Sequence, residues 1–393
     1  MFNPAVSRRT AFRGLAGFLA GSPLFGQQDL FRDDGRVPAL AEMRDTFDFE
    51  PVAHAKVARQ AYDYLAYGSD AEFTMRRNRE AFDWVELIPR RFTGAGPVQT
   101  GSSLLGQKLP FPILISPTAR HLLFHPDGEM ATHAGATAAN TTYIVSNVAT
   151  LPVEKIAAAA AGPWWFQLYP QPGPDYNRQT LEKAQTAGCK AVVVTVDQTA
   201  SSYDRALHGR NLATATAPVL VPQSAGQRSR LPSNAYHVST VRLWYEWKLF
   251  DELRPMIKVP MIAKGIVTAE DALLCLEHGV DAVYVSNHGG RSLDYEPSTL
   301  EVLPEIADAV HGRVPILFDS GVRRGADILK ALALGASAVC LGRAPLYGLA
   351  AYGPEGVQKV LEILQAELVQ AMAATGRLTL ASIDRTLVRT EFL

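Results

Sequence analysis

The chain contains eight short apolar runs rich in β-branched residues, and helical segments such as 269–278 and 325–334 separate most of them. The runs are 112–116, 142–146, 164–169, 191–196, 260–264, 282–286, 315–319 and 338–341. Continuous apolar runs that alternate with helices indicate parallel strands buried on both faces. Eight such units predict an α/β fold in which the strands close into a (β/α)8 TIM barrel.

The segment before the first strand, residues 39–82, shows apolar positions at helical spacing. These positions include Val57, Ala61, Tyr64 and Leu65. This periodicity predicts an N-terminal helical segment that caps the barrel. Gly106-Gln107 then separates two short apolar runs, a pattern typical of a hairpin, and we expect this hairpin to close one end of the barrel.

The spacing of the strands shows one long insertion. The fourth and fifth runs begin 69 residues apart, whereas the other neighbouring runs begin 22 to 33 residues apart. The additional residues lie between Gln198 and about Val241 and are rich in Ser, Ala, Pro and Gln. Long irregular loops in compact domains are either functional or disordered. The insertion after strand four is therefore either a mobile lid over the active site or a disordered spacer.

The composition excludes several classes of protein. Of the 393 residues, 47% are hydrophobic and the net charge is −1, so the chain can bury a large core and has no bulk attraction for nucleic acid or anionic lipid. Its three cysteines, Cys189, Cys275 and Cys340, show neither metal-ligand spacing nor the even count of a disulfide framework. We expect three buried thiols and no metal site.

The N-terminus has the pattern of a twin-arginine export signal over residues 1–28. Ser7-Arg8-Arg9 precede an apolar, Gly- and Ala-rich run from Gly14 to Phe25, which is too short to span a bilayer. We expect a periplasmic or otherwise exported protein whose barrel domain occupies 39–393. The alternative is a basic N-terminus on a cytoplasmic protein.

Polar residues follow the strands at the end where an α/β barrel has its active site. In strand order they are Ser116 and Thr118; Ser146 and Asn147; Gln167 and Tyr169; Thr195 and Asp197; Lys264; Ser286, Asn287, His288 and Arg291; Asp319, Ser320 and Arg323; and Arg343. One such residue often caps the next helix, but a purely structural barrel would not gather so many costly polar groups. The pattern predicts an active site centred on His288.

The last two strand ends indicate a phosphate site. Gly321, Arg323, Gly342 and Arg343 combine close backbone approach with cationic donors, and phosphate sites in such barrels commonly follow strands seven and eight. No dinucleotide-type glycine motif follows an early strand. This favours a mononucleotide or a phosphorylated substrate over NAD.

At these residues the chain resembles the FMN-dependent α-hydroxy-acid oxidase and dehydrogenase family, which includes glycolate oxidase, lactate oxidase, mandelate dehydrogenase and flavocytochrome b2. The resemblance extends from about Phe47 to Thr390, and its most specific segment runs from Ser286 to Tyr295. Supporting segments are Tyr62-Asp63-Tyr64, Pro117-Thr118-Ala119, His125-Pro126-Asp127-Gly128-Glu129, Phe166-Gln167-Leu168-Tyr169, Thr195-Val196-Asp197 and Gly321-Val322-Arg323-Arg324-Gly325. Matches this dense and collinear are not expected by chance.

The resemblance implies a role for each matching residue. The catalytic set is His288 as base, Asp197 as its orienting partner and Lys264 beside the flavin ring. The substrate set is Arg291, whose planar fork suits a carboxylate, with Tyr64, Tyr169 and Arg205. The FMN set is Thr118, Ala119, Ser146, Gln167, Thr195, Lys264, Ser286, Asp319, Gly321, Arg323, Gly342 and Arg343.

The chain departs from the family pattern at several positions. Arg205, in Ser202-Tyr203-Asp204-Arg205-Ala206-Leu207, matches the second substrate arginine only with a one-residue offset; it is either the second carboxylate clamp or a loop arginine paired with Asp204. Ser320 replaces a usual Gly, and its side chain either crowds the phosphate side or donates to it. Val148 replaces a usual bulky aromatic. His121 is unusual, and we expect it at the surface rather than facing the pocket.

These features predict FMN-dependent oxidation of a small L-2-hydroxy acid to the 2-oxo acid. Electrons would pass to a separate quinone, cytochrome or oxygen, because no haem-binding motif is present. The resemblance further implies a homo-oligomer, commonly a homotetramer. The alternatives are a flavin-binding barrel without turnover, and an isomerase or phosphosugar enzyme on the same barrel.

Overall fold

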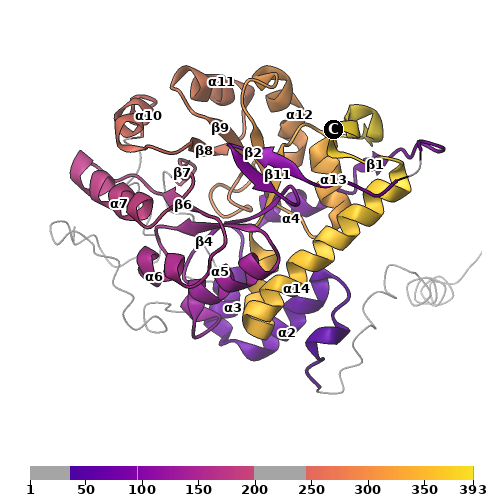
Figure 1. Cartoon of the computed structure of the whole chain (residues 1–393), viewed down its shortest axis with the longest axis horizontal. Coiled ribbons are helices and arrows are strands. Elements are labelled where there is room, and N and C mark those ends of the chain that lie inside the picture. Colours follow the sequence, from indigo (N-terminus) through magenta and orange to yellow (C-terminus); the bar gives the residue numbers. More distant parts are fainter. Residues whose placement is uncertain (1–35, 95, 199–244, 393) are drawn as a thin grey trace, which may run out of the picture. The chain divides into compact units, whose positions relative to one another are not determined.

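Eight parallel strands form a closed barrel in the order β10-β11-β4-β5-β6-β7-β8-β9 (Figure 1). The strands are β4 (Ile113–Thr118), β5 (Thr142–Ser146), β6 (Trp164–Leu168), β7 (Val192–Thr195), β8 (Met261–Ile266), β9 (Ala282–Val285), β10 (Ile316–Phe318) and β11 (Ala338–Leu341). Each predicted strand is present, and the predicted TIM barrel is confirmed. The computed structural model describes residues 36–94, 96–198 and 245–392. The export signal, Arg205 and nearly all of the insertion lie outside these residues.

Two strands extend beyond their predicted ends because the register shifts there. The pairing of β4 with β5 shifts between Ile115 and Thr118, and that of β8 with β9 shifts between Lys264 and Ile266. Such irregularities redirect side chains and are common beside active sites. Both lie at the carboxyl end of the barrel, where the polar residues gather.

Helices surround the barrel (Figure 1). They are α5 (Gly128–Ala138), α6 (Val153–Ala158), α7 (Pro174–Thr186), α10 (Lys248–Leu253), α11 (Ala269–Glu277), α12 (Thr299–Val310), α13 (Gly325–Ala333) and α14 (Arg343–Thr375). The long α14 is interrupted at Tyr352 and Gly353, which have non-helical backbone angles. Pro354 follows them and lacks the amide hydrogen that a continuous helix requires.

Three short helices, α2 (Phe49–Lys56), α3 (Arg59–Ala66) and α4 (Phe73–Glu80), make up the predicted N-terminal helical segment. Helix α4 is fixed to the loop after β9 and to the first turn of α13. Asn78 exchanges hydrogen bonds with Asn287, Thr74 N donates to Asp294, and Arg79 pairs with Asp327. The segment therefore lies over the carboxyl end of the barrel, as a cap on the site.

The opposite end of the barrel is closed by the predicted hairpin. Strands β2 (Ser102–Leu104) and β3 (Gln107–Leu109) pair in antiparallel fashion. Leu104 and Leu109 belong to the same buried cluster as the inward-facing residues of the barrel. In addition, the Trp165 indole donates to Gln107 Oε1 at 3.0 Å. A second antiparallel pair, β1 (Val85–Leu87) and β12 (Val388–Thr390), joins the segment after α4 to the C-terminal segment.

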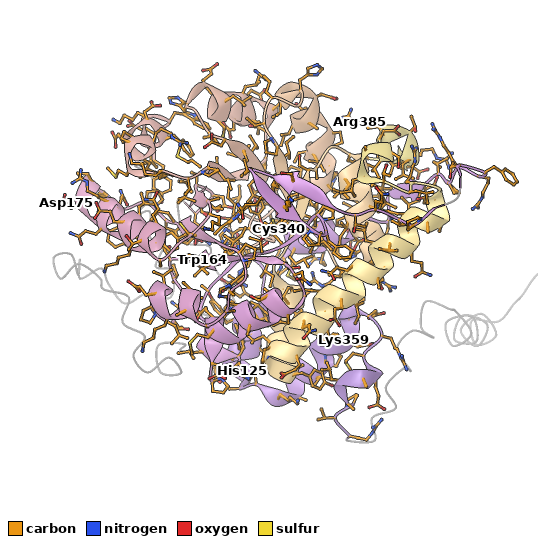
Figure 2. All side chains as sticks on the ribbon, viewed as in Figure 1. His125, Trp164, Asp175, Cys340, Lys359 and Arg385 are labelled. Atoms are coloured by element: carbon orange, nitrogen blue, oxygen red, sulfur yellow. The ribbon has the colours of Figure 1, made fainter. Side chains whose placement is uncertain are left out.

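The core has an inner and an outer layer, because successive residues of a strand point to opposite faces. The inner layer includes Leu114, Ile144, Trp165, Val193, Ile262, Tyr284, Leu317 and Cys340. The outer layer packs the alternate strand residues against the helices. In Figure 2, Cys340 lies near the centre of the ring of helices, whereas Asp175 and Arg385 lie on its outside. All three cysteines are free and buried, as predicted.

Among the described residues, none of the helices combines the length and the apolar character that a membrane span requires.

Candidate active site

A cavity of about 450 Å³ lies at the carboxyl ends of the strands, within the size range of small-molecule sites. The predicted site residues that line it are Tyr64, Thr118, Ala119, Ser146, Tyr169, Lys264, His288, Arg291, Asp319, Gly321, Arg323, Gly342 and Arg343. Four others, Gln167, Thr195, Asp197 and Ser286, are not among the lining residues. Because Gln198 also lines it after β7, the cavity brings together residues from all eight strand ends and from α3.

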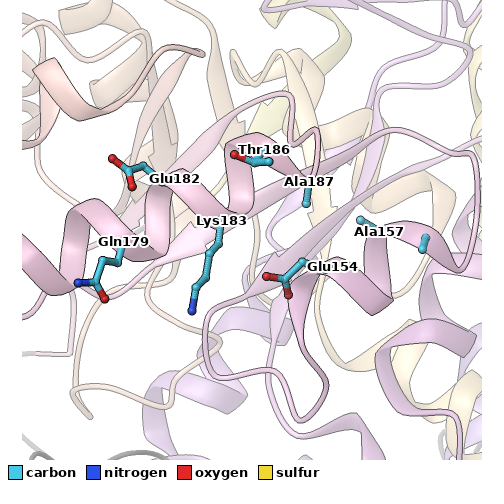
Figure 3. Close-up of a pocket in the computed structure, with 8 residues that line it drawn as sticks. Glu154, Ala157, Gln179, Glu182, Lys183, Thr186 and Ala187 are labelled. Atoms are coloured by element: carbon cyan, nitrogen blue, oxygen red, sulfur yellow. The ribbon is translucent and has the colours of Figure 1, made fainter.

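A second hollow, of about 730 Å³, lies between α6 and α7 and is open to solvent (Figure 3). It is the larger of the two by volume. Its lining consists of the outward faces of two helices, including Glu154, Gln179, Glu182 and Lys183, most of them exposed. No buried polar group faces it among the described residues. The 450 Å³ cavity is therefore the candidate active site.

His288 is held in a strained backbone conformation directly after β9. Its φ of 57° lies in the left-handed region, which costs a non-glycine residue free energy and is typical of functional sites. The backbone N–H of His288 donates to Ser286 Oγ at 3.1 Å, and the ring Nδ1 lies 2.9 Å from Asp197 Oδ1. Since this carboxylate can only accept, Nδ1 carries the hydrogen and Nε2 is available as a base.

Asp197 follows β7 and is ionised by its surroundings. Burial alone would raise the pKa of this carboxyl group, but electrostatic attraction to His288 and Lys264 and the hydrogen bond from His288 outweigh burial and lower it. Gly265 makes room for this carboxylate: its φ is +105°, and a Cβ at this position would lie 2.5 Å from the Cβ of Asp197. Any larger residue after Lys264 would collide with Asp197, so this position requires glycine.

Two polar groups lie beside the Nε2 atom of His288. The Tyr169 hydroxyl is 3.4 Å away and the Gln198 side-chain nitrogen is 3.3 Å away. Tyr169 was predicted at the site, whereas Gln198 was treated only as the start of the insertion. The position of Gln198 directly after Asp197, at the end of β7, is the sequence feature that could have identified it. A substrate hydroxyl at Nε2 would meet polar groups from three strand ends.

Arg291 is positioned by backbone carbonyls and aromatic rings from α3. Its Nη1 donates to the carbonyl of Tyr64 at 2.8 Å and more weakly to that of Tyr67. Its guanidinium carbon lies 3.8 Å from the ring centroid of Tyr67 and 5.1 Å from that of Tyr64, within the range of cation–π contacts. These contacts orient the planar guanidinium group at the cavity, in a form suited to a carboxylate.

Lys264 is a buried cation at the base of the cavity, only 3% exposed. Its Nζ donates to Ser286 Oγ at 2.8 Å and lies 3.8 Å from Asp319 Oδ2. Asp319 in turn accepts hydrogen bonds from the hydroxyls of Ser116, Tyr284 and Ser320. Buried charges persist when they are paired in this way, so this network holds a fixed positive charge against the cavity.

Two of the buried polar atoms that lack a protein partner among the described residues lie at neighbouring strand ends. They are Gln167 Nε2 and Thr195 Oγ1, at the ends of β6 and β7. Unsatisfied buried polar groups are rare and point to an absent ligand. The flat, polar-edged ring system of a flavin would supply such partners beside Lys264, so the residues present fit FMN at this position.

Three arginines give the cavity a cationic character. Arg291, Arg323 and Arg343 all line it, and the pKa of Arg343 is lowered to about 10 by burial and then by the charges of Arg291 and Arg323. Arg343 also donates to the carbonyls of Leu65, Tyr67 and Gly289. A bound phosphate or carboxylate would relieve this repulsion, which agrees with the predicted phosphate site.

Ser320, at a position where the resembling family usually has glycine, has a φ of 89°. Its hydroxyl donates to Asp319 Oδ1 and accepts from the backbone N–H of Gly289. The side chain is therefore accommodated by hydrogen bonds that join the loops after β9 and β10. Val148 lines the cavity as expected, and its small side chain leaves space there.

His121 is fully buried, so its predicted surface position is wrong. Its ring nitrogens lie 2.8 Å from the hydroxyls of Thr118 and Thr132, and its backbone N–H donates to Glu129. Burial lowers the pKa of His121, so the ring is neutral at pH 7. The surface prediction failed because α5 brings Thr132 and Glu129 to His121, and the end of β4 brings Thr118.

Glu296 is a further residue that the sequence analysis missed. Burial, and then the negative charge of Asp197, raise the pKa of its carboxyl group to about 7. Its Oε2 and the Oδ2 of Asp197 are both buried without a hydrogen-bond partner among the described residues. The negative charge of Asp197 thus opposes the ionisation of Glu296.

Replacing Glu296 by Gln should stabilise the protein at pH 8.5 but not at pH 5. The folded-state pKa, about 7, lies above the ordinary 4.5, so the stability that protonation gives is complete below pH 4.5 and is lost as the pH rises through 7. After allowance for its partial exposure, the gain at pH 8.5 is about 1–2 kcal/mol, a rise of roughly 1–2 °C in Tm for a protein of this size. Thermal unfolding monitored across pH measures it.

The exposed Glu305 on α12 provides the matched control, because Glu305→Gln neutralises a carboxylate that is already in water. Its Tm difference from the wild type should not grow with pH. A Glu296→Gln protein that is equally or less stable than the wild type at pH 8.5 would contradict the assignment of a strained carboxylate.

Comparison with known proteins agrees with this site. The model of the family described as FMN-dependent dehydrogenase matches residues 53–390. The chain is 38% identical over 352 residues to the peroxisomal (S)-2-hydroxyacid oxidase GLO4 of Arabidopsis thaliana, covering 88% of this chain and 96% of that protein. It is also 38% identical to 2-hydroxyacid oxidase 2 of Rattus norvegicus over 343 residues, which are 87% of this chain and 97% of that protein.

Solved structures give the same result. A mandelate oxidase in complex with (S)-2-phenylpropionate is 32% identical with a TM-score of 0.78, covering 89% of this chain and 99% of that one. A Pediococcus acidilactici structure described as a lactate oxidase is 32% identical with a TM-score of 0.80, covering 90% of this chain and 96% of that one. With the family model matching most of its length and the site residues converging on one cavity, this chain belongs to the FMN-dependent α-hydroxy-acid oxidase and dehydrogenase family.

Proposed function

We propose that this protein oxidises a small L-2-hydroxy acid to the 2-oxo acid, with His288 as the base. The observation that supports this most is the Asp197–His288 pair, whose Nε2 faces the cavity beside the oriented fork of Arg291. The relatives named above are 2-hydroxyacid, mandelate and lactate oxidases, which supports the same substrate class.

In this proposal, different residues bind the substrate and accept its proton. Arg291, with Arg205 as the second clamp, binds the substrate carboxylate, and Tyr64 and Tyr169 donate hydrogen bonds to its oxygens. His288 Nε2 accepts a proton from the substrate, and the ionised Asp197 stabilises the imidazolium that forms. Arg205 lies outside the described residues, so its role rests on the sequence alone.

FMN supplies the acceptor for the two electrons that leave when the alcohol becomes a ketone. Lys264 holds a fixed positive charge that favours the negative charge of the reduced ring. The ring would be lined by Thr118, Ala119, Ser146, Gln167, Thr195 and Ser286. Asp319 would hold the ribityl hydroxyls, and Gly321, Arg323, Gly342 and Arg343 the phosphate.

The proposal predicts that L-2-hydroxy acids reduce the bound flavin in the absence of oxygen. The purified protein, loaded with FMN, is mixed anaerobically with a panel of L- and D-2-hydroxy acids, and the flavin absorbance near 450 nm is followed. We expect bleaching with L-acids and not with D-acids. If none of the acids bleached the flavin, the protein would instead be a flavin-binding barrel without this activity.

A second mixing experiment identifies the electron acceptor. The relatives' names support oxygen, whereas export would place the protein near respiratory quinones and cytochromes. Mixing the substrate-reduced protein with air-saturated buffer, or with a soluble quinone or cytochrome c, shows which one reoxidises the flavin on the timescale of turnover. Export itself is proposed from residues 1–28, and an unchanged location after Arg8→Lys and Arg9→Lys would exclude the twin-arginine route.

A further inference from the structure

Arg120 contributes a positive charge to the cavity that the proposed reaction does not use. It follows β4 directly and lines the cavity together with Tyr64, Val148 and Arg291. Its φ of 64° is in the left-handed region, a conformation that costs an arginine free energy and that persists where the surroundings enforce it. The turn therefore keeps this side chain at the cavity wall at an energetic cost.

Arg120 and Arg291 lie around the same tyrosine. The guanidinium carbon of Arg120 is 5.5 Å from the ring centroid of Tyr64, and that of Arg291 is 5.1 Å from it. The two guanidinium groups are therefore at most about 11 Å apart. One small molecule with an anionic group at each end can reach both.

The described part of the chain offers Arg120 no anionic partner. Its backbone carbonyl accepts a hydrogen bond from Leu123 N, but its guanidinium group forms no hydrogen bond or ion pair with any described residue and contacts the ring of Tyr64. Asp319 is the one acidic side chain among the described residues that line the cavity, and it is already bonded by Ser116, Tyr284 and Ser320 and paired with Lys264. Cations oriented in a cavity without counter-charges indicate an anionic ligand.

The other cations of the cavity already have a ligand group in the proposed function. Lys264 faces the flavin ring, Arg323 and Arg343 face the phosphate, and Arg291 faces the substrate carboxylate. Arg120 has no ligand group in the proposed reaction, so it can bind a further anionic group. The small side chain of Val148 in the same wall leaves space for a substrate that extends toward it.

We propose that Arg120 binds a second carboxylate on the substrate, so that the preferred substrates are 2-hydroxy dicarboxylic acids of about four or five carbons. This inference rests on the proposed oxidation of 2-hydroxy acids and narrows its substrate class. Arg291 binds the carboxylate next to the reacting carbon, and Arg120 binds the one at the far end. The bidentate fork of each arginine fits a carboxylate.

The first test compares diacids with monoacids of equal chain length. L-malate is paired with L-2-hydroxybutyrate, and L-2-hydroxyglutarate with L-2-hydroxyvalerate, in anaerobic flavin reduction. The wild type should prefer each diacid. Arg120→Met should lower kcat/KM for the diacids about 10- to 100-fold, the loss expected for one charge-assisted hydrogen bond pair, and change that for the monoacids less than about threefold.

Arg120→Lys is the matched control, because it keeps the charge and loses the fork. It should retain part of the diacid preference. FMN content and Tm of both variants show whether the turn after β4 is intact. If Arg120→Met lowered kcat/KM for monoacids and diacids equally, Arg120 would be a structural residue and the proposal would be wrong. A wild-type preference for the monoacids would also overturn it.

Measurements of ligand binding distinguish a failure of this proposal from a failure of the proposed function. Should no acid reduce the flavin, calorimetric titration of the FMN-loaded protein with succinate and with butyrate still tests Arg120. Succinate should bind more tightly than butyrate, and Arg120→Met should remove the difference. Equal affinities in the wild type would overturn the second-carboxylate site, whereas flavin reduction by monoacids alone would leave the oxidation itself standing.

Discussion

Replacing His288 by Gln should slow flavin reduction by the preferred 2-hydroxy acid by about a thousandfold. A positioned general base contributes about 10²- to 10⁴-fold to a rate, and no other side chain among the described residues lies at the cavity with an oriented, unprotonated nitrogen beside a carboxylate. Stopped-flow absorbance in anaerobic buffer measures the rate. FMN should remain bound, because in the proposed site Lys264 and the ends of the other strands would line its ring and Asp319 would hold its ribityl hydroxyls.

The loss should fall on the rate constant at saturating substrate more than on the substrate affinity, because His288 acts on the proton that moves in the transition state. His311→Asn is the control: His311 is an exposed histidine that, like His288, has a left-handed backbone, and it lies at the end of α12. It should reduce flavin at the wild-type rate. A His288→Gln protein that retained a tenth or more of that rate would exclude His288 as the base.

Replacing Arg291 by Met should lower kcat/KM about a hundredfold or more, chiefly through a higher KM. Loss of one partner from a desolvated, hydrogen-bonded charge pair costs about 2–5 kcal/mol. The stacking of the Arg291 guanidinium on Tyr67 and its bond to the Tyr64 carbonyl hold the fork in place before the substrate arrives, so little ordering is needed on binding. Steady-state kinetics with a monocarboxylic 2-hydroxy acid measures the effect.

Arg291→Lys should recover only part of the loss, because an ammonium group cannot bind a carboxylate with two parallel hydrogen bonds or stack on Tyr67 in the same way. Arg385→Met serves as the control, since Arg385 is an exposed arginine paired with Asp308. An unchanged KM in Arg291→Met would show that the carboxylate is bound elsewhere, with Arg205 or Arg120 as the next residues to test.

Most of the barrel could be predicted because its determinants are local. A strand buried on both faces must be continuously apolar, and the helix that follows it must be amphipathic, so each unit can be recognised within about thirty residues of sequence. The ends of β5 and β11 agree with the prediction. β4 and β8 differ because their ends depend on register shifts against neighbouring strands, which a single strand does not encode.

The candidate site could be predicted to a similar extent, because a barrel brings all the strand ends to one place. His288, Lys264 and Asp319 needed only their positions after a strand. His121 and Glu296 could not be assigned in this way. Their properties come from residues that the fold brings to them: Thr118, Thr132 and Glu129 around His121, and Asp197 beside Glu296.

The sequence by itself thus determined the barrel, the end of the barrel that carries the chemistry, and the residue types gathered there. Only the tertiary structure decided which atoms face one another: that Asp197 fixes the ring of His288, that Arg120 and Arg291 lie around one tyrosine, and that the charge of Asp197 opposes the ionisation of Glu296. The physical reason is the separation along the chain over which each effect acts. Hydrophobic periodicity acts along a few turns of chain, whereas charge, burial and hydrogen-bond geometry depend on neighbours from distant strands and helices.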